Sequence, residues 1–330
     1  MTPRPHDALF KSAFEAPEDA AALLRELVPP AVRAAVAWET LDGERGSFVD
    51  PLLADQHSDL VFSAQLRTGE PALLYFLLEH QSTSDPGMPL RMLSYQNRIW
   101  DSFVKEHPRT RLAPIIAVLV SHVPEGWTAA RTFEDLFDPD VMALAGLAAL
   151  VPRFSLIIDD LMQLTDEDLA ARSLAAFPKL ALWLLRDARD PARLLGSFDA
   201  WIPAMLELGR TRSGRDRFAV LITYLFQVLD PVNLEKVRAK LRPLDPRNEE
   251  LAMTTAEYLH EEGRKQGHEE GREKGREEGR IATLRSLLVF KFQNLGAEHE
   301  ARLQAATPEA IDRYLQRLLT ADSLAAVFAD

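Results

Sequence analysis

Residues 58–81, SDLVFSAQLRTGEPALLYFLLEHQ, contain the pattern that decides the fold. Two runs that favour strands, 58–66 and 72–80, flank a turn-forming segment around Gly69, and a hairpin is the simplest interpretation. The second run contains LLYFLL, which is apolar without alternation. This predicts a strand that is buried on both faces and lies centrally in its sheet. Glu79 then places a charge at the end of a buried strand.

The register of this hairpin brings carboxylates together. If it is symmetric about Gly69, Asp59 faces Glu79 with Cβ atoms about 4.5–5.5 Å apart, and such a pair destabilises a sheet unless it is neutralised. A divalent cation with oxygen ligands is a natural neutraliser. Gln81 shares the face of Glu79, and His80 lies on the other. Alternatively, the carboxylates only mark where the strands leave the core, and a one-residue slip would break the pairing.

The segments around the hairpin predict an α/β core. A helix is expected near residues 7–27, and a further strand-like run follows at 113–123. Residues 147–244 are rich in Leu and Ala with regular prolines, which predicts successive short helices. A second helix, 88–106, carries a stripe that should face the core; it consists of Met88, Met92, Tyr95, Ile99 and Phe103.

Asp59 followed by Glu79-His80-Gln81-Ser82 resembles the D…(D/E)xK signature of the PD-(D/E)XK nuclease superfamily. Four fragments are similar to segments of its transposase-like (YhgA-like) recombination-promoting nucleases: HDALFKSAF (6–14), HSDLVF (57–62), LLEHQS (77–82) and PLRMLSYQNRIW (89–100). The fragments follow in the expected order within about the first 120 residues. The resemblance implies a restriction-endonuclease-like core, an αβββαβ mixed sheet, with an all-helical C-terminal extension.

The same resemblance implies a DNA endonuclease in which Asp59 and Glu79 bind Mg²⁺, or Mn²⁺ in its place. The metal would lower the pKa of a bound water and polarise the scissile phosphate. Gln81 replaces the superfamily lysine; it can orient water and offer an amide dipole, but it brings no charge. The net acidity and the missing lysine keep an alternative open, a weak or inactive nuclease-like scaffold that acts through protein partners.

Three accessory residues are expected near the site. Asp7 is where the superfamily often has an acidic residue on its first helix, although the sequence by itself predicts an N-cap. Arg91 is the candidate for phosphate binding, and Arg98 and Lys105 continue its stripe, which could equally be a solvated face. Gln96 is at a helix position where such nucleases often place a polar residue. The histidines 6, 57 and 80 lack a metal-binding spacing and are expected at the surface or behind the ligands.

Composition limits the classes of protein that remain. The 330 residues are 47% hydrophobic, enough for a substantial globular core, and the absence of cysteine excludes disulfides and zinc–thiolate sites. No signal-like N-terminus is present, and the apolar runs 113–123 and 141–151 are too short to span a bilayer, so a cytoplasmic protein without membrane contact is expected. The net charge of −12 requires any DNA site to be a local basic surface.

The chain should divide into a nuclease core (1–145), a helical extension (146–250), a charged glycine-repeat segment (251–282) and a helical tail (283–330). The repeat places glycine at every fourth position from 263 to 279. Such glycines weaken an isolated helix but allow close approach of another backbone. The segment is either a helix that joins copies of the chain through residues 257–290 or a flexible linker.

Overall fold

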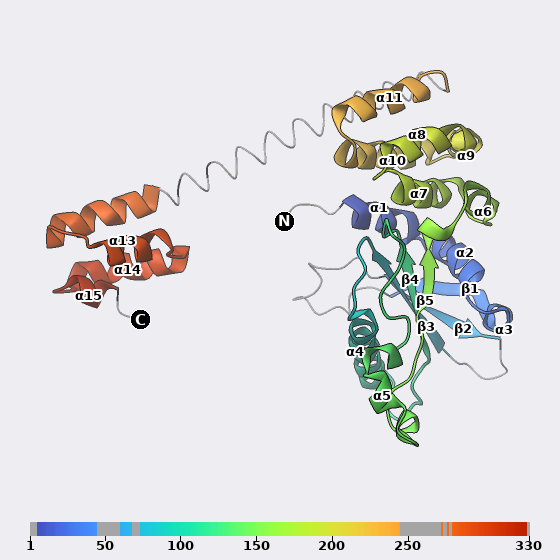
Figure 1. Cartoon of the computed structure of the whole chain (residues 1–330), viewed down its shortest axis with the longest axis horizontal. Coiled ribbons are helices and arrows are strands. Elements are labelled where there is room, and N and C mark those ends of the chain that lie inside the picture. Colours follow the sequence, from blue (N-terminus) through green and yellow to red (C-terminus); the bar gives the residue numbers. More distant parts are fainter. Residues whose placement is uncertain are drawn as a thin grey trace. The chain divides into compact units, whose positions relative to one another are not determined.

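The predicted hairpin forms the middle of a five-stranded sheet in the computed structural model (Figure 1). Strands β2 (Leu60–Leu66) and β3 (Leu73–Gln81) are antiparallel, and the pairing runs from Leu60 with Leu78 to Gln65 with Leu73. This is the register symmetric about Gly69. The sheet order β1-β2-β3-β4-β5 makes β3 central, as its unbroken apolar run predicts.

The structure describes residues 5–44, 60–67, 73–244, 272, 276 and 279–328. Asp59 and His57 lie outside these ranges, so the predicted Asp59–Glu79 pair is not described. The chain divides into two compact units, Met1–Thr255 and Ala256–Asp330. Among the described helices, none is long and apolar enough to cross a membrane.

The sheet is mixed. Strand β1 (Val36–Gly43) pairs antiparallel with β2, whereas β4 (Ile115–Ser121) is parallel to β3, and β5 (Ile157–Asp160) is parallel to β4. The parallel pair β3–β4 requires a crossover, and α4 (Met88–Glu106) provides it. An α/β fold with a mixed sheet is therefore confirmed.

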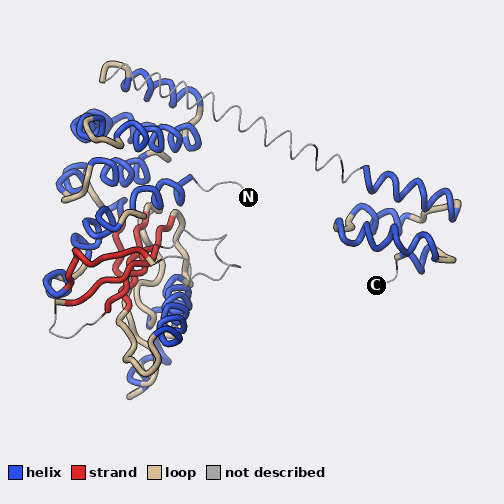
Figure 2. Tube along the Cα trace, turned by 180° about the vertical axis from the view of Figure 1, so that it is seen from behind, coloured by secondary structure: helices blue, strands red, loops and turns tan. Residues whose placement is uncertain are grey.

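Helices cover both faces of the sheet, as Figure 2 shows with the strands in red. Alternate residues of β3 point to opposite faces. Leu74, Phe76 and Leu78 belong to the core cluster that contains α1 (Pro5–Phe14) and α2 (Pro17–Leu27), whereas Tyr75 packs with Ile99 and Phe103 of α4. All five residues of the predicted α4 stripe are buried, which confirms that prediction.

Two expectations for the helices need correction. The single helix expected near residues 7–27 is two, because Pro17 begins α2, and proline is favoured at a first helical position and not inside a helix. The stretch 147–244, expected to be all-helical, contains β5. This strand has only four residues, too few for a visible period of two, and its backbone hydrogen bonds come from β4.

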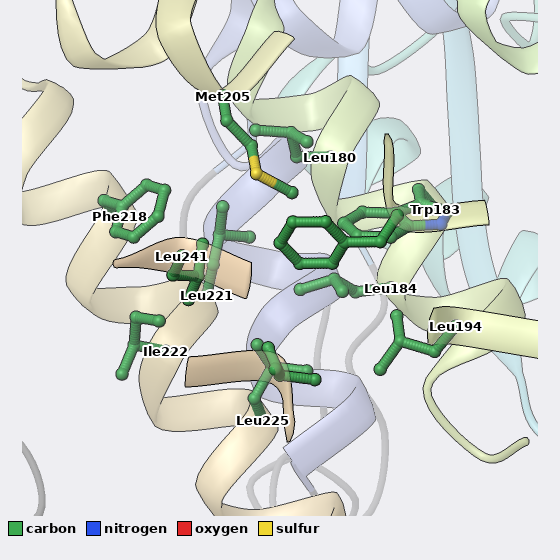
Figure 3. Close-up of a pocket in the computed structure, with 12 residues that line it drawn as sticks. Leu180, Trp183, Leu184, Leu194, Met205, Phe218, Leu221, Ile222, Leu225 and Leu241 are labelled. Carbon is green, nitrogen blue, oxygen red and sulfur yellow. The ribbon is translucent and has the colours of Figure 1, made fainter. Parts of the chain in front are cut away.

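The remaining elements of the first unit are short. They are α3 (Pro30–Ala35), η1 (Glu134–Leu136), α5 (Pro139–Met142), η2 (Leu147–Ala149), η3 (Leu161–Gln163), α6 (Asp166–Ala171), α7 (Ala176–Asp187), α8 (Pro191–Ser197), η4 (Phe198–Trp201), α9 (Ile202–Gly209), α10 (Gly214–Val228) and α11 (Pro231–Leu241). Helices α7 to α11 surround an apolar pocket, where Trp183, Met205 and Leu225 are among the side chains that converge (Figure 3). One continuous apolar cluster joins these helices to the sheet.

The described part of the second unit is helical. A helix through residues 279–292 packs with α13 (Ala297–Gln304), α14 (Pro308–Thr320) and α15 (Leu324–Val327). Its core includes Leu284, Leu288 and Ile311. Of the repeated glycines only Gly279 is described, so the predicted association helix or linker at 257–290 falls largely outside the described residues.

Candidate functional site

Glu79 is a buried carboxylate at the carboxyl end of the central strand, with 1% of the residue exposed. Its Oε1 accepts hydrogen bonds from Gln81 Nε2 at 2.7 Å and from Arg91 Nη2 at 3.0 Å. Its Oε2 is buried and has no hydrogen-bond partner among the described residues. Because a buried acceptor without a partner costs free energy, Glu79 presents an oxygen that is suited to a further ligand.

The geometry of β3 and α4 brings Glu79, Gln81 and Arg91 together. Gln81 lies two residues after Glu79 and therefore points to the same face of β3. Parallel pairing of Glu79 with Leu119 and of Gln81 with Ser121 holds this strand end against β4. Helix α4 covers the same face, and its first turn carries Arg91.

Asp85 is a site residue that the sequence analysis missed. Its Oδ1 accepts from the backbone N–H of Gly87, just before α4, and its Oδ2 accepts from Arg91 Nη1 at 2.9 Å. Arg91 thus bridges Glu79 and Asp85 and places a positive charge beside the buried carboxylate. The Asp-Pro-Gly sequence at 85–87 signalled the turn, but not the contact with Arg91.

The other predicted site residues are Asp59, Asp7 and Gln96. Asp59 is outside the described residues. Asp7 is not an N-cap, because α1 begins at Pro5; its Oδ1 lies 3.4 Å from Nδ1 of His80, on the opposite face of β3 from Glu79. Gln96 is buried on α4, and no described hydrogen bond joins it to Glu79. The structure therefore joins Glu79, Gln81 and Arg91 through hydrogen bonds, and it places Asp7 on the other face of β3.

A second polar cluster occupies the face of β3 opposite to Glu79. The His80 ring stacks between Phe10 of α1 and His122, with ring centroids 5.0 Å and 4.7 Å away. His6 contacts His122 edge-on and hydrogen-bonds the Tyr224 hydroxyl at 2.9 Å. Within the described ranges, no group of three acidic or histidine side chains is arranged to hold a metal ion.

Burial makes these histidines weak bases. It lowers the pKa of His6 from 6.5 to about 4 and that of His122 well below 6.5, and neighbouring charges such as Arg189 act in the same direction. Burial also lowers the pKa of His80, against the opposing effect of Asp7. Two of the rings, on α1 and β3, were expected at the surface or behind a metal. His80 is buried and stacks on the buried His122, whereas the partly buried His6 contacts His122 edge-on, so the surface alternative is wrong for His80.

Comparison of the sequence with known proteins identifies one family and several relatives. The model of a family described as "Putative transposase, YhgA-like" matches residues 4–211. Recombination-promoting nuclease RpnD of Escherichia coli O157:H7 is 27% identical over 79% of this chain and 96% of its own length. RpnA of Escherichia coli K12 is 26% identical over 79% of this chain and 85% of its own.

One further relative from Escherichia coli K12 carries a different description. Inactive recombination-promoting nuclease-like protein RpnE is 28% identical over 81% of this chain and 85% of its own length. No solved structure matches the chain.

Proposed function

Since the chain belongs to the YhgA-like transposase family, we propose that it is a metal-dependent endonuclease that hydrolyses phosphodiester bonds in DNA. The observation that carries this proposal is the Oε2 of Glu79, a buried carboxylate oxygen at the carboxyl end of the central strand that has no hydrogen-bond partner among the described residues. The names of RpnD and RpnA, recombination-promoting nucleases, support the same class of reaction.

The residues present fit a magnesium ion in part. Glu79 Oε2 is an available oxygen ligand of the type that Mg²⁺ prefers. The hairpin register, continued by one pair beyond Leu60 and Leu78, would bring Asp59 opposite Glu79 as the second carboxylate. Mg²⁺, or Mn²⁺ in its place, would lower the pKa of a bound water and polarise a phosphate oxygen.

The protein groups would supply orientation and charge. Gln81 is held by its hydrogen bond to Glu79 and would orient the attacking water. Arg91 brings the positive charge that Gln81 lacks, because its guanidinium lies 3.0 Å from Glu79 Oε1. Its Nε is also buried without a partner among the described residues, and a phosphate oxygen that entered the site would satisfy this donor.

The fold we propose is the restriction-endonuclease-like one. Its αβββαβ order agrees with the succession of α1 to α3, β1, β2, β3, α4 and β4 in this chain. Open α/β sheets bind ligands beyond the carboxyl ends of their parallel strands, and both Glu79 and Gln81 lie at such an end.

A nuclease-like scaffold without activity is the second candidate. Arg91 neutralises Glu79 and is itself paired with Asp85, so the charges form a structural ion-pair set that does not need a metal. RpnE, a relative that is described as inactive, supports this second candidate.

Cleavage of a supercoiled plasmid separates the two candidates. The full chain should nick the plasmid with Mg²⁺ and not with a chelator, and Glu79→Gln should abolish nicking. The matched control is Glu39→Gln, which removes an exposed carboxylate from strand β1. Full nicking by Glu79→Gln would refute the proposed site, and no nicking by the unaltered chain would favour the scaffold.

A further inference from the structure

We propose that Arg189 is an anchor for the DNA backbone, contributed by the helical part of the first unit to the same strand end that carries Glu79. This inference rests on the proposed function and adds a residue to it. Arg189 follows α7, more than 100 residues after β3. Contacts with Ser82 and His6 hold it at the carboxyl end of that strand.

The guanidinium of Arg189 is oriented but not neutralised. Nη1 donates to the carbonyl oxygen of Ser82 at 3.0 Å, and Nε donates to His6 Nε2 at 3.3 Å. Neither acceptor is a carboxylate. Arg189 is exposed and forms no salt bridge within the described part of the chain, although the charge of Glu125 is near enough to affect its pKa. Nη2 donates to no described residue and remains available.

The tautomer of His6 explains how Arg189 can be held by a hydrogen bond without being neutralised. An arginine Nε–H can only donate, so Nε2 of His6 must be the acceptor and the ring must be neutral. The proton then lies on Nδ1, which donates to the Tyr224 hydroxyl at 2.9 Å, and that hydroxyl donates to the Leu184 carbonyl. The lowered pKa of His6, about 4, agrees with a neutral ring.

The remaining neighbours add no compensating anion at the guanidinium. His80 and His122, which stack behind His6, have pKa values lowered by burial, and burial raises the pKa of Tyr224, so all three are uncharged near pH 7. Asp7, the acidic group of this cluster, lies 3.4 Å from His80 Nδ1, and its charge is not among those that shift the pKa of Arg189.

A phosphodiester fits this arrangement because arginine binds phosphate oxygens through its planar set of donors. The chain carries a net charge of −12, so an arginine without a carboxylate partner at the proposed active edge is a local exception to its acidity. Arg91 approaches the end of β3 from α4, and Arg189 approaches from the α1 and α7 side. A duplex that reaches Glu79 would meet both cations.

Equilibrium binding tests this proposal. The full chain and its variants would be titrated into a fluorescent DNA duplex with chelator present, so that no cleavage occurs, over a series of KCl concentrations. Arg189→Ala should weaken binding on the order of tenfold at low salt, the effect of one charged hydrogen bond. It should also reduce the slope of log affinity against log salt by about 0.9. Arg189→Lys should keep the slope.

Arg212→Ala is the matched control, since it removes an exposed arginine charge from the loop before α10. If Arg189→Ala and Arg212→Ala have the same affinity and slope while the unaltered chain binds, Arg189 only fastens the backbone at Ser82 and this inference is wrong. The proposed nuclease would then still stand. Absence of binding by the unaltered chain would overturn this inference, and the plasmid assay with Mg²⁺ would then decide the proposed nuclease separately.

Discussion

The ion pair between Arg91 and Glu79 should carry much of the stability at the candidate site. The side chain of Glu79 is 2% exposed and that of Arg91 is 23% exposed, so the pair is largely shielded from water. In Arg91→Met the aliphatic stem is kept, but Glu79 becomes a buried charge without a cation. Removing one partner of a buried pair costs about 3–5 kcal/mol.

Thermal unfolding of the first unit measures this cost. For a unit of this size 1 kcal/mol corresponds to roughly 2–4 °C, so the melting temperature should fall by roughly 6–20 °C in the presence of chelator. The double variant Arg91→Met, Glu79→Gln should recover part of the loss, because the buried charge is then absent. Added Mg²⁺ should also restore part of it in Arg91→Met, provided that the ion binds Glu79.

Arg67→Met is the matched control. It breaks the Arg67–Glu39 ion pair, which has a similar N–O distance of 2.7 Å but side chains 53% and 60% exposed, and it should have little measurable effect. If Arg91→Met destabilises the unit no more than Arg67→Met does, the buried charge of Glu79 is not held by Arg91. The charge arrangement described for the site would then be wrong.

Three further predictions concern Gln81, His122 and the second unit. Gln81→Ala should slow single-turnover DNA cleavage by about 10²–10³ while Mg²⁺ affinity by calorimetry stays the same, because the ligand carboxylates remain; a wild-type rate would remove Gln81 from the active face. Burial lowers the pKa of His122 well below 6.5, so the unfolded chain binds more protons as pH falls from 6.5 toward the folded pKa. The free energy of unfolding should therefore decrease on acidification below pH 6.5 and be insensitive to this group above it; urea denaturation of His122→Phe should show a flatter pH dependence, and an unchanged dependence would contradict this assignment. A chain that ends at Thr255 should cleave DNA but form smaller assemblies in light scattering, and equal assembly sizes would reduce residues 257–290 to a linker.

The sequence pattern predicted those elements that are determined by residues close together in the chain. The hairpin register was predictable because a turn around Gly69 and the alternation of strand side chains constrain which residues face each other. The bounds of α4 and its buried stripe followed from helical periodicity in the same way. The placement of Glu79 and Gln81 on one face and of His80 on the other needed only the period of a strand.

The tertiary structure alone decided which distant residues meet. Arg189 reaches Ser82 across 107 positions, and Tyr224 reaches His6 across 218, so no periodicity could have indicated either contact. Strand β5 likewise exists because β4 provides its hydrogen-bond partners. Period and turn chemistry act within about ten residues, whereas these contacts form only when helices and strands pack and the hydrophobic core excludes water from their polar groups.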